Sequence, residues 1–174
     1  NITHEAGFAY LDANATWSDA LDGQCVVYGV GDVNVSIPGT YWLKYNFTDE
    51  AGNQATEVKR MVHVINTPPT SPETNDALEI SEKMSVGTVL GQFHSTDRNG
   101  DPLTFRLREA EGSPESSPFS LSEQGVLQTR VVLDYETNAS EYQIGVVVRD
   151  PHGGRADGNF TVKLLNVVED NDQD

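Results

Sequence analysis

Apolar and polar residues alternate along most of this chain with a period of two, which is typical of β-strands that bury one face. The clearest runs are residues 41–48, 58–65, 142–148 and 160–164. Turn-forming pairs and clusters rich in glycine, proline, asparagine and aspartate separate the runs, and helical patterning is almost absent. Many short strands between such turns predict an all-β chain built from antiparallel β-sandwiches.

The strongest candidate for a domain boundary is the proline-rich stretch 66–72. Prolines cannot donate hydrogen bonds to a strand ladder, and they favour an extended, stiff connection. We therefore expect two tandem sandwiches, residues 1–66 and 67–169. An acidic segment, residues 170–174, would follow them.

The chain carries 27 acidic and 11 basic residues among its 174, a net charge of −16. Nucleic acids and anionic membranes need basic partner surfaces, so this balance argues against both. No run of about 18 apolar residues is present, so no membrane insertion is expected. Cys25 is the only cysteine, which excludes an internal disulfide and predicts a buried thiol in a strand.

Six Asn-x-Ser/Thr sequons occur along the chain. In a eukaryotic secreted protein they would be glycan acceptors. In a bacterial chain rich in asparagine and threonine they arise by chance, and this is the interpretation that the sequence favours. They start at Asn1, Asn14, Asn34, Asn46, Asn138 and Asn159.

Acidic residues gather where predicted strands end, which suggests ligands for a hard cation that takes six to eight oxygens. One group places oxygen-bearing side chains at alternate positions of a loop, at Asp97, Asn99 and Asp101. This spacing matches the start of an EF-hand. However, Pro102 replaces the required glycine and Arg108 replaces the required glutamate. Another ligand must complete the site, and Asp150 is the expected one.

The second acidic group is Glu82, Asp134 and Glu136. Two acids two residues apart in an extended segment point to the same side, so both can reach one ion. The Asp-x-Glu pair alone is weak evidence, because most such pairs are only solvated. A glycosidase would also use two carboxylates, but it needs a cleft lined by aromatic residues, and the second domain has few. We therefore expect no enzymatic activity.

The ordered motifs of the second domain resemble a cadherin repeat of the bacterial type over about residues 70–169. They are Ile80-Ser81-Glu82, Val86–Gly91, Ser95–Phe105, Leu133-Asp134-Tyr135-Glu136 and Val148-Arg149-Asp150. The resemblance implies a seven-stranded Greek-key sandwich with calcium at its two poles. At the C-terminal pole it implies the ligands Glu82, Asp134 and Glu136, with Asn166 and Glu169 in place of the family's Asp-x-Asn-Asp-Asn run. At the N-terminal pole it implies Asp97, Asn99, Asp101 and Asp150.

The first domain resembles bacterial immunoglobulin-like modules of secreted and cell-wall proteins. The matching pieces are mostly turns: residues 19–23, 37–41 and 47–56. They indicate a fold and imply no activity. Residues 170–174 resemble the opening of an acidic calcium-binding repeat, and a disordered acidic tail is an equal alternative.

The expected function is a non-enzymatic, calcium-binding structural or adhesion module of a bacterial extracellular or cell-surface protein. Its partners would be neighbouring domains of the same chain, and a surface protein or a polysaccharide is a further candidate. The alternative is a carbohydrate-binding accessory module of a secreted polysaccharide hydrolase. That alternative needs exposed aromatic platforms, for which Trp17 and Trp42 are the candidates.

Overall fold

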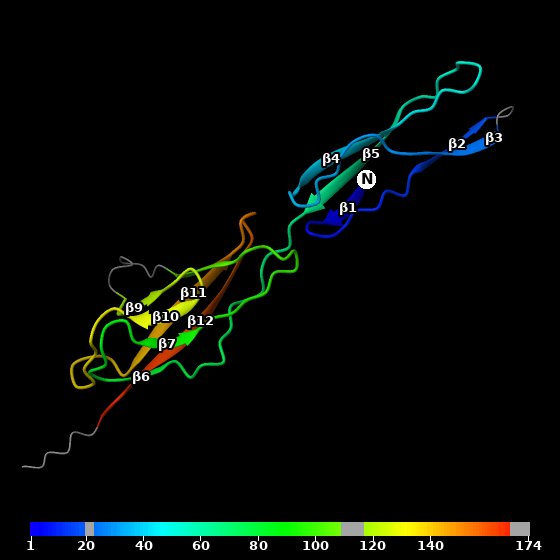
Figure 1. Cartoon of the computed structure of the whole chain (residues 1–174). Coiled ribbons are helices and arrows are strands. Elements are labelled where there is room, and N and C mark those ends of the chain that lie inside the picture. Colours follow the sequence, from blue (N-terminus) through cyan, green and yellow to red (C-terminus); the bar gives the residue numbers. More distant parts are fainter. Residues whose placement is uncertain (20–22, 109–116, 168–174) are drawn as a thin grey trace, which may run out of the picture. The chain divides into compact units, whose positions relative to one another are not determined.

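The computed structural model of the chain describes residues 1–19, 23–108 and 117–167. The chain separates into two compact units, Asn1–Thr67 and Pro68–Asp174, called unit 1 and unit 2 below. All regular elements among the described residues are strands, which confirms the all-β class (Figure 1). Within the described parts of the chain, no helix is long and apolar enough to span a membrane.

Unit 1 contains a three-stranded sheet in the order β1-β5-β4 and a separate hairpin of β2 and β3. The strands are β1 (Ile2–Glu5), β2 (Ala15–Asp19), β3 (Gly23–Val27), β4 (Gly39–Tyr45) and β5 (Val58–Ile65). The alternation along β4 and β5 determines which side chains are buried. Leu43, Tyr45, Val62 and Val64 face the core, whereas Trp42 is half exposed on the opposite face.

Unit 2 is a sandwich of two sheets, in the orders β7-β10-β9 and β6-β12-β11-β8 (Figure 1). The strands of the first sheet are β7 (Val89–Gln92), β9 (Phe119–Leu121) and β10 (Val126–Thr129). Those of the second are β6 (Glu79–Ser81), β8 (Thr104–Leu107), β11 (Glu141–Arg149) and β12 (Arg155–Leu165).

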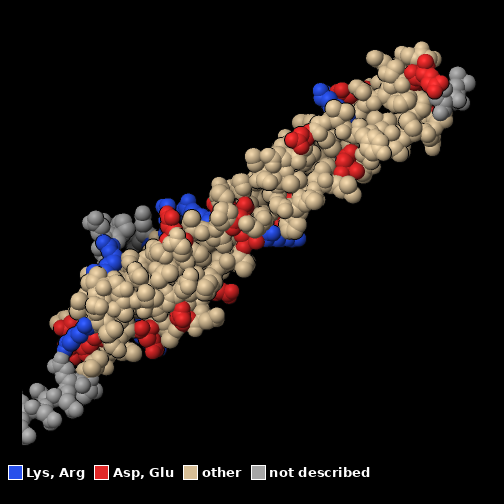
Figure 2. Space-filling view, in the orientation of Figure 1, with Lys and Arg blue, Asp and Glu red and all other residues tan. Residues whose placement is uncertain are grey.

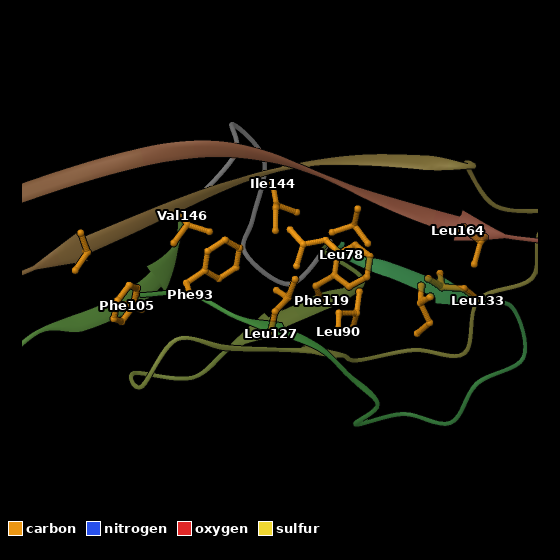
Figure 3. Close-up of a cluster of buried hydrophobic side chains, with 13 residues drawn as sticks. Leu78, Leu90, Phe93, Phe105, Phe119, Leu127, Leu133, Ile144, Val146 and Leu164 are labelled. Carbon is orange, nitrogen blue, oxygen red and sulfur yellow. The ribbon is translucent and has the colours of Figure 1, made fainter. Parts of the chain in front are cut away.

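The core of unit 2 lies between these two sheets. Phe119 and Leu127 come from one sheet and Ile144 and Val146 from the other, and they meet in the space between the layers (Figure 3). Phe93, in the segment after β7, is also fully buried. Burying one such side chain contributes about 1.5–3 kcal/mol, so this shared core holds the two layers together.

The pairing is antiparallel except for two strand pairs at sheet edges. β1 runs parallel to β5, and β6 runs parallel to β12. Cys25 lies in β3 as predicted, but it is half-buried and not buried as expected. The reason is that β2 and β3 form a two-stranded hairpin outside the main sheet, so the face of β3 that carries Cys25 and Val27 is only partly covered.

Strand direction places the acidic segments of unit 2 at two opposite ends of its sandwich. Because β6 and β12 are parallel, both end near Glu82. β11 is antiparallel to β12, so β11 ends at the other pole, immediately before Asp150. The two groups of candidate ligands are therefore separated by the length of the sheet.

Candidate metal sites

The structure brings together three carboxylates at the end of β11, from Asp97, Asp101 and Asp150. Their closest oxygens all lie within 4.8 Å of one another. We call this group the N-terminal cluster. Asp97 and Asp101 belong to the loop after β7, and Asp150 follows β11 directly. Sequence spacing alone predicted the first two, and strand pairing brings the third to them.

Each loop of the N-terminal cluster is shaped by hydrogen bonds that its own aspartate accepts. Asp97 Oδ1 accepts from the backbone N–H groups of Asn99 (2.8 Å) and Asp101 (3.3 Å). Asp150 Oδ1 accepts from the N–H groups of His152 and Gly154, both at 2.8 Å. One oxygen of each of these two aspartates therefore holds its loop in shape.

Two further oxygens of this cluster are buried without any hydrogen-bond partner among the described residues: Asp97 Oδ2 and Asp101 Oδ2. A buried carboxylate oxygen without a partner is costly, because the charge loses its hydration and gains nothing in return. His152, in the second loop, places its Nε2 3.7 Å from Asp101 Oδ1. Three carboxylates gathered in this way form the kind of oxygen-rich, negatively charged environment that could hold a metal ion.

Because Gly154 has no side chain, it leaves room for the carboxylate of Asp150. A Cβ at this position would come within 2.0 Å of Asp150 Oδ2 and 2.9 Å of Pro68 Cα. Such distances are far below any van der Waals contact, so no other residue fits without moving the carboxylate. The sequence suggested only a turn here. The need for glycine beside the ligand became visible once the two atoms were placed together.

Asn99 lies between the two clustered aspartates, and its backbone N–H completes the turn on Asp97. Gly100 adopts a positive φ of 78°, which lets the loop reverse direction at this point. The predicted ligand set Asp97, Asn99, Asp101 and Asp150 is thus contained in two short loops at one pole.

The opposite pole holds a second group, Glu82, Asp134 and Glu136, whose oxygens also lie within 4.8 Å of one another. We call it the C-terminal cluster. Asp134 and Glu136 were expected in an extended segment, but residues 135–137 form a turn. Asp134 Oδ1 accepts the N–H of Glu136 at 3.0 Å, so the turn itself brings the two carboxylates together.

Glu82 is almost fully buried, at 3 % exposure, and it joins three parts of unit 2. Its Oε1 accepts the N–H of Val167 at 2.8 Å, and its Oε2 accepts the N–H of Tyr135 at 3.2 Å. These two N–H groups, from Val167 first and Tyr135 second, hold the pKa of Glu82 below its usual value. Glu82 is therefore a charged group that fixes the segment after β12 to the turn of Asp134.

The effect on Glu136 has the opposite sign. Its contact with the Asp134 carboxylate, followed by desolvation and the charge of Glu82, raises the pKa of Glu136. A raised pKa means that adding the last negative charge to this cluster is unfavourable. A bound cation would remove this penalty, as at the other pole.

Of the two remaining predicted ligands, Asn166 is exposed and lies next to Val167, whose N–H is bound to Glu82. Glu169 and the acidic segment 170–174 lie outside the described residues. On the face shown in Figure 2, acidic side chains occur over both units. The clusters are distinguished by convergence of carboxylates, since acidity alone is spread widely.

A sugar-binding site would need an exposed platform of aromatic side chains, and Trp17 and Trp42 are not arranged as one. Trp17 packs against Phe47, with ring centroids 4.1 Å apart. Trp42 is 50 % exposed on β4, and its cross-strand neighbour is Met61. No ring contact joins Trp42 to another aromatic residue within the described parts of unit 1.

Comparison with known proteins supports the two-domain organisation. Residues 1–64 match the model of the family described as bacterial surface protein, Ig-like domain, and residues 76–166 match the cadherin domain model. The chain belongs to the cadherin family. It consists of a bacterial-type immunoglobulin-like domain followed by a cadherin domain, as the sequence motifs predicted.

Curated relatives match 60–71% of this chain. Mouse protocadherin-15 is 37% identical over 105 residues, which is 60% of this chain and 5% of that protein. The protein dachsous of Drosophila melanogaster is 29% identical over 136 residues, 71% of this chain and 4% of its own length. The cadherin chain described here therefore corresponds to a small part of these relatives.

Similar solved structures are also extracellular cadherin fragments. Human mucin-like protocadherin EC1-2 aligns over 95% of both chains at 16% identity, with a TM-score of 0.48. Drosophila N-cadherin EC1-4 covers 74% of this chain and 33% of its own, at 13% identity and a TM-score of 0.49. The two matched families are adhesion and surface modules, which agrees with an extracellular or cell-surface location.

Proposed function

We propose that this chain is a non-enzymatic structural or adhesion module that binds calcium at both carboxylate clusters of unit 2. The observation that carries the proposal is the pair of buried, unpartnered oxygens of Asp97 and Asp101, beside the buried Asp150. A cation between them would supply the missing interaction for all three groups. The cadherin family to which unit 2 belongs supports calcium as the ion.

The donor set favours calcium over softer metals. Both clusters consist of carboxylates, and hard cations with oxygen ligands are the ions that such sites select. Asn99 and Asn166 would add neutral oxygens at the N-terminal and C-terminal clusters respectively. Extracellular modules of this kind bind with dissociation constants on the order of 10⁻⁴ to 10⁻³ M.

Calcium would act here as a structural element. Without it the clustered carboxylates repel one another. Because the ion binds the folded state alone, it stabilises that state by mass action, by about 1.4 kcal/mol per site at tenfold excess over the dissociation constant. Partners of such a module would be neighbouring domains of the same chain, and a surface protein or polysaccharide is a further candidate.

The test is a thermal unfolding series on the whole chain in chelator, in calcium and in magnesium. We expect calcium to raise the melting temperature of unit 2, with a smaller effect of magnesium. Asp101→Asn should remove the contribution of the N-terminal cluster, and Glu136→Gln that of the C-terminal cluster. The matched control is Glu123→Gln, an exposed acid of unit 2 outside both clusters. Identical melting curves with chelator and with calcium would refute the proposal.

The match of unit 1 to a bacterial surface family supports a bacterial surface protein as the parent. The carbohydrate-binding alternative remains a separate candidate, favoured by the half-exposed Trp42. A pull-down on insoluble polysaccharides with the wild-type chain and with Trp42→Ala distinguishes the two. Binding that is lost in the variant would support the alternative.

A further inference from the structure

Five-residue segments around the sequons share a feature beyond Asn-x-Ser/Thr. Of the six sequon asparagines, five have a residue two positions earlier in the chain, and in four cases that residue is acidic. The four segments read acidic-x-Asn-x-hydroxyl. They are Asp12–Thr16, Asp32–Ser36, Glu136–Ser140 and Asp157–Thr161.

These frequencies exceed what composition supplies. Acidic residues make up 27 of 174 positions, so about one of five would precede a sequon asparagine in this way, against four observed. The chain has 12 asparagines and 26 serines and threonines, which predicts about two sequons by chance, against six. The pattern therefore argues against the chance origin that the sequence analysis favoured.

The spacing has a direct structural meaning. In an extended chain, side chains at positions i, i+2 and i+4 point to the same side. A carboxylate, an amide and a hydroxyl spaced by two can therefore all be contacted by one groove of an enzyme. In the folded chain the segment Asp32–Ser36 runs into a turn, in which Asn34 accepts hydrogen bonds from the N–H groups of Ser36 (3.0 Å) and Ile37 (3.4 Å). Asp32, Asn34 and Ser36 are exposed, whereas Val33 and Val35 between them are half-buried.

Asn34 is accessible in the folded chain. Its Oδ1 accepts the backbone N–H of Ser36 at 3.0 Å, so this hydrogen bond engages the amide oxygen and not Nδ2. Among the described residues, no hydrogen bond or ion pair engages the Asp32 carboxylate. The backbone behind the segment is anchored, because Gly7 N–H donates to Val35 O at 2.8 Å.

In the folded chain, the segments around Asn14 and Asn159 are engaged in hydrogen bonds with other side chains. Asp12 accepts hydrogen bonds from Arg60 and Tyr45, and Asn14 has a positive φ of 61°, which is not extended. Asn159 lies within β12, where its Oδ1 accepts from Arg108 Nη2 at 2.9 Å. The same Arg108 atom donates to Asp157 at 2.9 Å. An enzyme could bind these segments only before the chain folds.

Asn138 is exposed but belongs to the C-terminal cluster. Its Oδ1 accepts the N–H of Asp134 at 2.8 Å, and the acidic residue of its segment is Glu136. A calcium ion held by Glu136 would compete with any enzyme for that carboxylate. Asn34 is thus the segment in which pattern and accessibility coincide.

We propose that Asn34 is an N-glycan acceptor for an oligosaccharyltransferase that requires the acidic residue two positions before the asparagine. The donor is an oligosaccharide carried on a polyprenyl diphosphate. Asn34 Nδ2 forms a bond to C1 of the first sugar and loses a proton. The bond between that C1 and the diphosphate oxygen breaks, and the lipid diphosphate leaves. The proposal rests on extracellular export but is independent of calcium.

The test co-expresses the exported whole chain with a bacterial oligosaccharyltransferase of the acid-requiring type and its lipid-linked oligosaccharide, followed by intact mass and peptide mapping. We expect addition of the oligosaccharide at Asn34, and loss of that addition in Asn34→Gln, Ser36→Ala and Asp32→Asn. Because all three side chains are exposed, the melting temperature should not change. We expect lower occupancy at Asn138 and none at Asn14 or Asn159 in the folded chain.

Asn46 supplies the matched control. It is an exposed sequon asparagine preceded by Lys44, also exposed, in place of an acid. It should remain unmodified in the wild type and become an acceptor in Lys44→Asp. The proposal is wrong if Asn34 stays unmodified, or if Asp32→Asn leaves its occupancy unchanged. Neither outcome bears on calcium, which is measured on the unglycosylated chain.

Discussion

Unit 1 and unit 2 each bury carboxylates, but they neutralise them differently. In unit 1, Asp12 accepts hydrogen bonds from Arg60 and from the Tyr45 hydroxyl at 2.8 Å, and Arg60 lies over the Tyr45 ring. In unit 2, the N-terminal cluster gathers three carboxylates, and among the described residues its atoms Asp97 Oδ2 and Asp101 Oδ2 are buried without a hydrogen-bond partner. The difference teaches that convergent carboxylates with unpartnered buried oxygens are better metal candidates than a single buried acid that the fold already pairs.

Removing the internal cation of unit 1 should give the largest effect. Arg60→Ala leaves Asp12 charged and partly buried without its partner, which is expected to lower the free energy of unfolding by about 3 kcal/mol. Calcium should not restore the loss, because among the described residues Asp12 belongs to no group of three side chains that could hold a metal ion. Urea unfolding with and without calcium measures both effects.

Lys59→Ala is the matched control for that experiment. Lys59 precedes Arg60 on β5 and is exposed, with an ion pair to Glu57 at 3.5 Å. Exposed pairs of this kind contribute about 0–1 kcal/mol. If Arg60→Ala were as mild as Lys59→Ala, the view that Arg60 neutralises Asp12 would be wrong.

The next effect concerns the space beside Asp150. Gly154→Ala places a Cβ where the Asp150 carboxylate lies, and overpacking of this kind costs about 1–3 kcal/mol. Because the carboxylate must move, the calcium-dependent rise in melting temperature should also shrink. Gly39→Ala is the control, since its nearest atoms, on Tyr41, would lie 3.7 Å away. If the Gly154→Ala chain kept the full calcium-dependent rise in melting temperature, the site would not depend on glycine at this position.

Much of this fold is readable from the sequence, because alternation is a local property. The run 58–65 corresponds to β5, and the run 142–148 lies within β11. What the pattern cannot supply is pairing, since registers depend on residues far apart in the chain. The parallel pairs β1–β5 and β6–β12 were missed for this reason. The exposure of Cys25 was missed because nothing local shows that β3 leaves the main sheet.

The residues of the candidate sites could be predicted from the sequence, but their geometry could not. Strand-end acids suggested the groups, and the geometry shows that each group converges. Three features depend on atoms brought together only by folding: the Gly154 gap, the N–H of Val167 on Glu82, and the turn between Asp134 and Glu136. The Arg60–Asp12 pair spans 48 residues, and no short-range signal marks it.

The pH dependence of stability should differ in sign between the two kinds of acid. Burial tends to raise the pKa of Asp12, but hydrogen bonds from Tyr45 and Arg60 and the charge of Arg60 outweigh it, so the pKa lies below 3.8. Its stabilisation is therefore fully present above pH 3.8 and is lost as pH falls through the folded-state pKa. The pKa of Glu136 is raised, so in chelator stability is gained as pH falls through its folded-state value.

The variants Asp12→Asn and Glu136→Gln isolate these two contributions. Unfolding is measured in chelator from neutral pH downward, and each variant is compared with the wild type at every pH. The advantage of the wild type over Asp12→Asn should disappear below pH 3.8, whereas the advantage of Glu136→Gln over the wild type should disappear as Glu136 protonates. Curves that shift in parallel at all pH values would contradict both assignments.

The smallest effect is expected at Asp157, an exposed acid that already pairs with the basic side chain of Arg108. Arg108 Nη2 donates to Asp157 at 2.9 Å, and the two side chains are 39 % and 44 % exposed. Water screens such a pair, so Arg108→Gln should change the free energy of unfolding by about 0–1 kcal/mol. The glutamine retains part of the contact over Gly145, which Arg108 covers. Urea unfolding at low and high salt measures the effect. A loss as large as that of Arg60→Ala would mean that exposure does not separate these two acids, and burial would no longer explain the difference between Asp157 and Asp12.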